Sequence, residues 1–260
     1  MHNLAIVIPA HNEEKRIGNT LREYIPYFTN QIKLGKIKSF KIIVVVNACS
    51  DNTLGVVNPY AGKFLEILNF VKGGKGFAVI EGFKHAIKNN YSIVGFVDAD
   101  MSTRPDEFNR IIHSLGDADG VIASRYLPGA RLSPPNTLIR MTASRVYNFF
   151  IRAMLFIPFR DTQCGAKIFR REALIRIVPL IGMTQWAFDI ELLYLLHVYR
   201  FKIKETATVW SNKDYSKIDF WKSGPWMALA IVRLRMLHSP FKKMVRLYDK
   251  FIHFFKPTNK

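Results

Sequence analysis

Short, mainly apolar runs recur along the first half of the chain, and in the stretches between them apolar residues return every three or four positions. Consecutive apolar positions predict strands buried on both faces of a sheet, and the wider spacing predicts amphipathic helices. Strands are expected at residues 4–8, 42–46, 64–70, 93–97 and 119–123, and helices near residues 17–25, 77–87 and 105–114. This alternation predicts an α/β fold with a mainly parallel sheet flanked by helices.

The second half of the chain has a different pattern. A bulky, apolar helix is expected over residues 138–156, and its narrow polar stripe consists of Arg140, Ser144, Asn148 and Arg152. Such a helix fits a bilayer interface, and the alternative is a helix half buried on the domain. Beyond residue 221 aromatic and basic residues are interleaved, with Asp249 the only acidic residue, which predicts basic amphipathic helices on an anionic membrane.

Charge and cysteine content narrow the class of protein. The formal net charge of +18 indicates a nucleic acid, an acidic lipid or a phosphorylated substrate as partner. Cys49 and Cys164 are too few for a disulfide framework and fit a reducing compartment. Met1 leads directly into a short apolar strand, so no signal peptide is expected, and no apolar stretch is long enough for a membrane-spanning helix.

Two carboxylates, Asp98 and Asp100, end the apolar run at residues 93–97. Alternate residues of a strand share a face, so both side chains can point to one side of the sheet edge. Carboxylates of this kind suit Mg²⁺ or Mn²⁺ held together with substrate phosphates. Taken alone, the pair is a weak signal, and it favours a solvated turn that leads into a helix at Pro105.

Further polar groups follow the other expected strands. Lys75 lies in a glycine-rich turn before a helix, an arrangement that binds anions, and Asn12 and Ser50 or Asp51 are expected to cap helices. Because carboxyl ends of parallel strands meet at one edge, the polar groups after these strands should converge there. They are Glu13, Asn47, Asp51, Lys75, Asp98, Asp100 and Arg125. This joint placement favours a metal–nucleotide site over a simple turn.

Two later segments also carry acidic residues. A polar loop at residues 161–167 begins with Asp161, and an apolar helix expected at residues 186–198 contains Asp189 and Glu191. Buried carboxylates are costly unless they are paired or used. The functional interpretation is a role in the site, and the alternative is a structural ion pair with a nearby arginine.

These residues resemble the inverting glycosyltransferases of the GT-A type, which have a Rossmann-like fold. Within that type they are similar to the dolichyl-phosphate glucosyltransferase and dolichyl-phosphate mannose synthase group. The matching segments span residues 6–217 and begin with Pro9-Ala10-x-Asn12-Glu13-Glu14, Gly74-Lys75-Gly76, Asp98-Ala99-Asp100 and Ser124-Arg125. They continue with Asp161-Thr162-Gln163-Cys164-Gly165-x-Lys167, Trp186-Ala187-Phe188-Asp189-x-Glu191 and Ser216-Lys217. Two departures concern the donor site: His11 replaces a usual aromatic residue, and Asn47-Ala48-Cys49-Ser50 replaces acidic residues followed by Gly-Ser.

The resemblance implies a role for each matching residue. Pro9, Ala10, Asn12, Glu13, Asn47, Asp51, Lys75, Gly76 and Asp98 are expected to bind the nucleotide-sugar donor. Asp98 and Asp100 are the expected ligands of Mg²⁺ or Mn²⁺, and the acceptor phosphate is expected on Arg125, Arg140, Ser144 and Lys217. Asp161 and Asp189 are expected to orient sugar hydroxyls, with Asp189 the candidate general base. Asn47 can pair with a pyrimidine edge through its amide, which leaves the preferred base open.

The implied function is inverting, metal-dependent transfer of a sugar from a UDP-glucose-like donor to a polyprenyl (dolichyl-type) phosphate. A phosphate monoester has a second pKa of about 6, so this acceptor needs no general base. GDP-mannose or UDP-N-acetylhexosamine remains an alternative donor, and a glycan hydroxyl remains an alternative acceptor that would require Asp189. A non-catalytic protein that binds nucleic acid is disfavoured, because the acidic site would repel phosphate.

The expected organisation follows from the same comparison. Residues 1–218 would form the catalytic domain, with a nucleotide-sugar half over 1–125 and an acceptor half over 126–218. Residues 219–260 would form the basic helices that attach to a membrane. The protein is therefore expected to be peripheral on the cytoplasmic face of a membrane, because its lipid acceptor stays in the bilayer.

Overall fold

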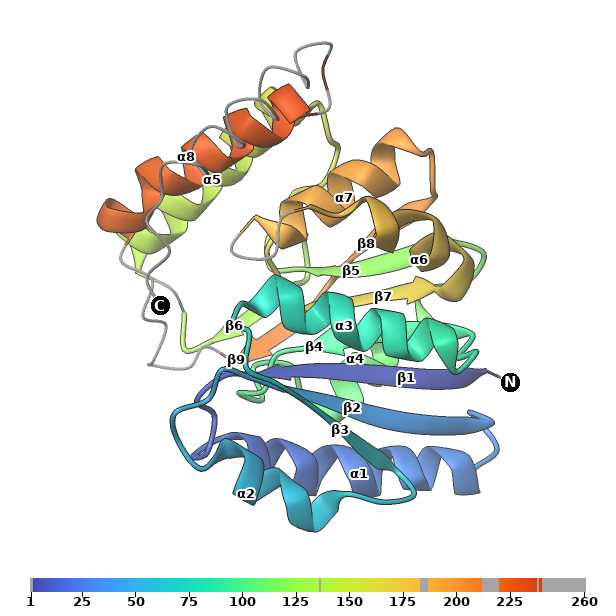
Figure 1. Ribbon diagram of the computed structural model, residues 1–260. Helices are drawn as coiled ribbons and strands as arrows, with labels where there is room; N and C mark the ends of the chain where they lie inside the picture. The colour runs from blue at the N-terminus through green and yellow to red at the C-terminus, as the bar shows by residue number, and fades with distance from the viewer. Residues whose placement is uncertain (1, 136, 183–186, 212–219, 238, 240–260) are drawn as a thin grey trace.

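A seven-stranded sheet forms the centre of the computed structural model, which describes residues 2–135, 137–182, 187–211, 220–237 and 239 (Figure 1). The strands are β1 (Asn3–Ala10), β2 (Ser39–Asn47), β3 (Leu65–Phe70), β4 (Ile93–Val97), β5 (Gly120–Ser124), β7 (Ala166–Arg170) and β8 (Ile203–Ala207). Their order is β3-β2-β1-β4-β7-β5-β8, and only β7 runs antiparallel to its neighbours. The expected mainly parallel α/β sheet is confirmed, and β3 and β8 form its edges.

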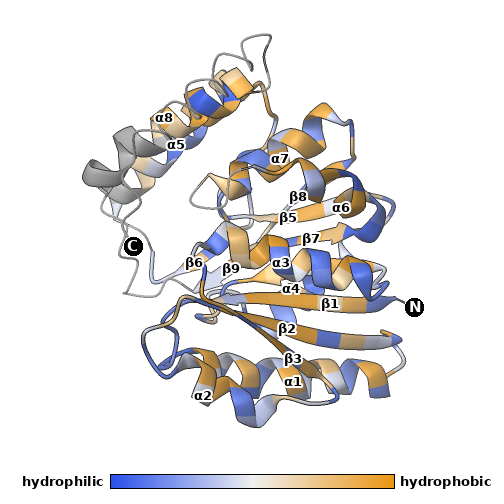
Figure 2. Ribbon diagram, viewed as in Figure 1, coloured by the Kyte–Doolittle hydropathy of each residue, from blue (hydrophilic) through white to orange (hydrophobic). Residues whose placement is uncertain are grey.

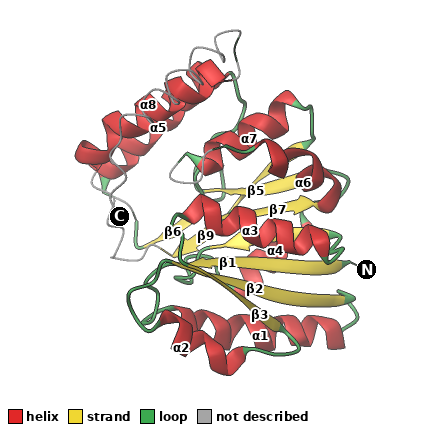
Figure 3. Cartoon of the chain, in the orientation of Figure 1, coloured by secondary structure: helices red, strands yellow, loops and turns green. Residues whose placement is uncertain are grey.

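Helices cover both faces of this sheet (Figure 3). They are α1 (Ile17–Lys33), α2 (Thr53–Val57), α3 (Lys75–Lys88), α4 (Pro105–His113), α6 (Arg171–Ile177) and α7 (Phe188–Val198), with short 3₁₀ turns η1 (Asn58–Tyr60) and η2 (Val178–Leu180). Side chains alternate along β1, so Ile6 packs toward α1 and α4 and Val7 packs toward α3 and α7. The central strands are therefore hydrophobic along most of their length, as Figure 2 shows.

A smaller unit of structure is built from two separate segments, one between β5 and β7 and one after β8. Strands β6 (Arg131–Ser133) and β9 (Val209–Ser211) form a two-stranded parallel ribbon, and helices α5 (Leu138–Leu155) and α8 (Phe220–Leu237) pack side by side. In Figure 1 this helix pair extends away from the central sheet. Ile151 and Leu155 of α5 and Ile231 and Leu234 of α8 are buried in the shared core. Among the described helices, none combines the length and hydropathy needed to cross a membrane.

Several expected boundaries are wrong, each for a local reason. Asn12 does not cap α1: it has a left-handed backbone (φ 54°), and the helix begins only at Ile17. The N-cap of α2 is Asn52, not Ser50 or Asp51. Pro9 does not end its strand, because β1 pairs with β2 as far as Ala10. Strand β4 stops pairing with β1 at Val7, so a backbone N–H at position 9 is not needed on that side.

Candidate active site

The carboxyl ends of β1, β2 and β4 meet at one edge of the sheet and bring together the charged groups expected there. Lys75, the first residue of α3, forms an ion pair with Asp98, with 2.6 Å between Nζ and Oδ1. Burial raises the pKa of Asp98 and Lys75 lowers it, but the nearby carboxylate of Asp100 raises it further. The same carboxylates act on Glu13: burial raises its pKa, the ion pair with Arg16 lowers it, and Asp100 and Asp98 add to the rise.

A tight turn holds Asp100 beside this pair. Its Oδ1 accepts a hydrogen bond from the backbone N–H of Ser102 (2.9 Å), and Met101 between them has a left-handed backbone (φ 62°). One carboxylate oxygen of Asp100 is thereby fixed in direction. The turn presents the acid at the strand end, where open α/β sheets bind their ligands.

Gly165 closes the space behind Asp98. The backbone N–H of Asp98 donates to the carbonyl of Gly165 (3.2 Å), and a Cβ atom added to Gly165 would lie 1.9 Å from Oδ2 of Asp98. Only a glycine lets the 161–165 loop approach the acid this closely. The loop between α5 and β7 is therefore part of the site.

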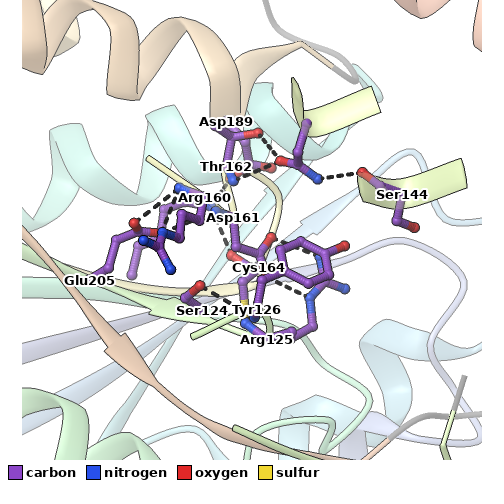
Figure 4. A network of polar contacts seen from close by, with 12 residues as sticks. Ser124, Arg125, Tyr126, Ser144, Arg160, Asp161, Thr162, Cys164, Asp189 and Glu205 are labelled. Carbon is purple, nitrogen blue, oxygen red and sulfur yellow. Dashed lines mark hydrogen bonds and ion pairs between the residues drawn. The ribbon is translucent and has the colours of Figure 1, made fainter. Parts of the chain in front are cut away.

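The other end of the same loop anchors Arg125 (Figure 4). The guanidinium donates two hydrogen bonds to Asp161 (Nε to Oδ2 2.8 Å, Nη2 to Oδ1 2.9 Å), and the backbone N–H of Arg125 donates a third (2.9 Å). The guanidinium also lies over the rings of Tyr126 (5.7 Å) and Trp210 (5.3 Å). Asp161 is fully buried, so its carboxylate positions Arg125 instead of standing open to a sugar hydroxyl.

Asp189 of α7 is paired with a lysine of the central sheet. Lys167 of β7 is fully buried, and its Nζ donates to Oδ1 of Asp189 (2.6 Å) and to the carbonyl of Cys164 (2.7 Å). The expected ion pair exists, but its partner is a lysine, not an arginine. Sequence reasoning missed this because residues 166–170 were assigned no strand, whereas β7 inserts between β4 and β5.

Helix α5 contacts the Arg125 region through polar side chains. The hydroxyl of Tyr126 shares a hydrogen bond with the side chain of Ser144. Asn148 donates to the carbonyl of Ser144 (2.9 Å) and accepts from the hydroxyl of Thr162 (3.3 Å). The structure thus brings Ser144 to the Arg125 region, as expected. Lys217 and the side chain of Arg140 lie outside the described residues.

Tyr126 and Trp210 belong to this region and were missed by sequence reasoning. The signal for Tyr126 was its position directly after Ser124-Arg125 at a strand end. Trp210 reaches the site only through β9, which pairs with β6 from a distant part of the chain, and no local pattern indicated it.

Two of the remaining expected donor residues, Asn12 and Asp51, bind backbone groups of the neighbouring loops. Oδ1 of Asn12 accepts from the N–H of Ser50 (2.8 Å), and Oδ2 of Asp51 accepts from the N–H of Glu14 (3.1 Å). Burial would raise the pKa of Asp51, but hydrogen bonds from Thr53 and Glu14 outweigh it and hold the pKa below its usual value. Asn12 and Asp51 therefore join the loops after β1 and β2. Pro9 and Ala10 are the last two residues of β1, and the buried Gly76 is the second residue of α3.

Comparison of the sequence with known proteins identifies the family of this chain. The family model for glycosyl transferase family 2 matches residues 5–178. This chain belongs to glycosyl transferase family 2. It is 32% identical over 243 residues to a dolichyl-phosphate beta-glucosyltransferase of Dictyostelium discoideum, an alignment that covers 89% of this chain and 73% of that protein. The human dolichyl-phosphate beta-glucosyltransferase is 28% identical over 251 residues, covering 90% and 76%.

A solved structure of another protein has a fold similar to that of this family 2 glycosyltransferase. Glucosyl-3-phosphoglycerate synthase from Mycobacterium tuberculosis, crystallised with Mn²⁺, UDP and phosphoglyceric acid, superposes with a TM-score of 0.64 at 16% identity. The superposition covers 90% of this chain and 78% of the synthase. The expected GT-A type, Rossmann-like fold is confirmed, and the protein is a glycosyltransferase.

The site of this glycosyltransferase fits a divalent cation whose ligands come partly from protein carboxylates and partly from a substrate. Within the described ranges, no three acidic, histidine or cysteine side chains are grouped closely enough to hold a metal by themselves. Asp100 and Asp98 supply carboxylate oxygens, and buried Oε2 of Glu13 has no hydrogen-bond partner. Mg²⁺ and Mn²⁺ are often held by one or two carboxylates plus diphosphate oxygens, and the acids at this edge match that pattern.

Replacing Asp161 by asparagine should destabilise the glycosyltransferase by about 3–5 kcal/mol, because it leaves the charge of Arg125 without its partner. Although burial raises the pKa of Asp161, Arg125 outweighs burial and lowers it. The contribution of Asp161 to stability is therefore present above the unfolded-state pKa and is lost as pH falls through the lower folded-state pKa. Denaturant unfolding at pH 7 and at acid pH measures both effects. Equal stability of wild type and variant at pH 7 would contradict the pairing.

Proposed function

We propose that this enzyme transfers glucose from UDP-glucose to a polyprenyl phosphate of the dolichyl type, with inversion at the anomeric carbon. One observation carries the proposal: a single loop contacts Asp98 through Gly165 and holds Arg125 through Asp161. The carboxylate expected to bind the nucleotide sugar and a fixed arginine are therefore held by the two ends of the short 161–165 loop. The names of the curated relatives, which act on dolichyl phosphate, support the choice of acceptor.

In the proposed reaction an acceptor phosphate oxygen forms a bond to the anomeric carbon while the bond from that carbon to UDP breaks. Asp100 and Asp98 would hold the metal, and Lys75 offsets the charge of Asp98. A bound Mg²⁺ or Mn²⁺ would neutralise charge on the departing UDP. Arg125, together with Ser144 and the expected Arg140 and Lys217, would bind the acceptor phosphate through charge-assisted hydrogen bonds.

No general base is required in this scheme. The acceptor is a phosphate monoester and is already ionised at neutral pH. Asp189 is held by the buried ammonium of Lys167, which fixes the carboxylate in place. We therefore assign Asp189 to positioning the sugar, and Asp161 to positioning Arg125.

The proposal is tested by a direct transfer assay. The purified enzyme is incubated with Mn²⁺, a short-chain polyprenyl phosphate and, in separate reactions, UDP-glucose, UDP-N-acetylglucosamine and GDP-mannose. Transfer of glucose to the lipid phosphate is expected. Transfer from GDP-mannose in preference to UDP-glucose would overturn the donor assignment. Transfer only to a glycan hydroxyl, abolished in Asp189→Asn, would overturn the acceptor assignment.

The acceptor side can be tested separately. Ser144→Ala and Arg140→Ala should each raise KM for the polyprenyl phosphate about tenfold or more, because each removes a hydrogen bond to a charged phosphate, and should leave KM for the nucleotide sugar unchanged. Thr142→Ala, an exposed hydroxyl loss in the same helix, serves as the matched control. If the variants lose affinity for the nucleotide sugar and keep affinity for the acceptor, α5 belongs to the donor site.

We further propose that the α5/α8 pair attaches the enzyme to the membrane that holds its acceptor. Large apolar side chains are exposed on and beside both helices: Val146 (63%) and Phe149 (70%) on α5, Phe156 (70%) directly after α5, and Leu229 (59%) on α8. Arg145 and Arg152 are exposed on α5, and the guanidinium of Arg235 lies 5.2 Å from the ring of Phe156. Exposed apolar groups interleaved with cations suit the surface of an anionic bilayer. Of the basic helices expected over residues 219–260, residues 219, 238 and 240–260 lie outside the described residues.

Membrane attachment predicts binding to vesicles that contain phosphatidylserine. High salt should weaken this binding without abolishing it, because each cation contributes about 1 kcal/mol that salt screens and the buried apolar groups are not screened. Phe149→Asp should weaken it about tenfold. Leu34→Asp, at a similarly exposed apolar residue (57%) after α1, should have no effect. Sedimentation with vesicles measures each case, and failure of the wild type to sediment at low salt would contradict the proposal.

A further inference from the structure

Helix α1 carries two hydroxyl groups on the face that it buries against the sheet. The buried positions of this helix are Ile17, Thr20, Leu21, Tyr24, Phe28 and Gln31. Thr20 and Tyr24 lie one helical turn apart, and both are 0% exposed. Burying a hydroxyl is unfavourable unless it forms a hydrogen bond, so each of these two groups needs a partner in the interior.

Both partners are backbone carbonyls of the turn that follows β4. The hydroxyl of Thr20 donates to the carbonyl of Ala99 (2.6 Å), and the hydroxyl of Tyr24 donates to the carbonyl of Thr103 (2.8 Å). The carbonyl of Arg16, in the same helix as Thr20, is much farther from its hydroxyl, at 3.5 Å. A hydroxyl has one proton to donate, so Thr20 donates it to the turn.

A third element holds the same turn, which contains Asp100 and the left-handed Met101 (φ 62°). The backbone N–H of Ser211, the last residue of β9, donates to the carbonyl of Ser102 (2.9 Å). A left-handed backbone is strained in a residue that has a Cβ atom, and it persists only where the surrounding structure fixes it. The hydrogen bonds from α1 and β9 supply that constraint from two sides.

We propose that Thr20 and Tyr24 are positioning residues that hold the Asp100 turn in the shape that binds the cation. This inference rests on the proposed use of Mg²⁺ or Mn²⁺ by the enzyme. The two hydroxyls act through backbone carbonyls on either side of the acid and do not touch the metal. Without one of them the strained turn can relax, and the carboxylate of Asp100 then loses its fixed direction. Affinity for the acceptor phosphate, on the Arg125 side, should not change.

Variants of equal shape test the proposal, because they remove a hydroxyl and keep the packing. Thr20→Val and Tyr24→Phe should each raise the dissociation constant for Mn²⁺ about fivefold to tenfold, the effect of about one hydrogen bond. Paramagnetic relaxation of water measures this constant in the presence of UDP. KM for the polyprenyl phosphate should stay at the wild-type value. Thr20→Ser returns the hydroxyl and should restore the affinity for Mn²⁺.

Thr29→Val is the matched control in the same helix. The hydroxyl of Thr29 donates to the carbonyl of Ile25 (2.7 Å), so this variant loses a hydrogen bond of the same kind away from the turn. It should bind Mn²⁺ as the wild type does. The melting temperature of every variant is measured alongside. If Thr20→Val is too unstable to assay, Tyr24→Phe decides, because its ring can still pack on Phe28 and Phe108.

The outcomes separate the positioning role from the proposed function. Wild-type affinity for Mn²⁺ in both Thr20→Val and Tyr24→Phe would overturn the positioning role and leave the metal site intact. The role would also be overturned if Thr29→Val lost as much affinity, if Thr20→Ser failed to restore it, or if KM for the acceptor rose as much as the Mn²⁺ constant. A wild-type enzyme that binds UDP without binding Mn²⁺ would overturn the proposed use of the metal, and the positioning role with it.

Discussion

Asp100→Ala is expected to lower kcat about 10³-fold or more and to abolish stimulation by Mn²⁺. The side chain lies in a turn at the strand end. Its Oδ1 accepts from the N–H of Ser102, and its second oxygen takes part in no hydrogen bond of that turn. Loss of the cation would remove several kcal/mol of charge stabilisation from the departing diphosphate. Stability should change by only about 1 kcal/mol, because the variant loses one hydrogen bond, from the N–H of Ser102.

The measurement pairs activity with metal binding. Turnover is followed with and without Mn²⁺, and Mn²⁺ binding in the presence of UDP is followed by paramagnetic relaxation of water. Asp106→Ala is the matched control, since this aspartate is largely exposed (63%) at the start of α4. Wild-type turnover by Asp100→Ala protein treated with a chelator would exclude the metal assignment.

Gly165→Ala is expected to lower kcat about 100-fold while the protein remains folded. The new methyl group would lie 1.9 Å from Oδ2 and 2.5 Å from Cγ of Asp98, so the Asp98 side chain must move, which disturbs its ion pair with Lys75. Misplacing a reacting group by about 1 Å is enough for a loss of this size. The clash involves the end of a side chain, and Gly165 does not have a positive φ, so the backbone accepts alanine.

Gly182→Ala provides the control for this experiment, because its added methyl group would meet only Oε1 of Glu191 at 3.8 Å. The control should retain wild-type kcat and melting temperature. A Gly165→Ala enzyme with wild-type kcat would show that Asp98 need not occupy its observed position. A large loss of melting temperature in Gly165→Ala would show instead that the loop is a folding element.

The first half of the fold could be predicted because its strands are buried on both faces. The runs at residues 4–8, 42–46 and 93–97 are apolar at nearly every position and correspond to β1, β2 and β4. Strand β7 was missed because Lys167 and Arg170 interrupt its apolar pattern. Lys167 is nonetheless fully buried, and its charge is balanced by Asp189, a residue from another element. Such a pairing between distant segments leaves no local signal.

The candidate site was predicted in place but only partly in detail. Residues that follow parallel strands must meet at one sheet edge, and this rule correctly brought Asp98, Asp100 and Lys75 together. Whether a polar side chain there faces a substrate or a neighbouring loop depends on contacts between loops. Asp51 and Asn47 have the residue types of ligands, yet their side chains bind backbone groups of Glu14 and Gly74. Residue type alone does not separate these two uses.

The edge strand β8 affects whether molecules of this enzyme associate through their sheets when they are close together. A strand with an open edge can pair with another chain and start aggregation. Here the edge carries Lys204, whose ammonium pairs with Asp117, and Glu205, whose carboxylate accepts from the backbone N–H of Arg160. Extending the sheet at β8 would mean desolvating or displacing these charges. Molecules of this enzyme can therefore collide along this edge and separate again.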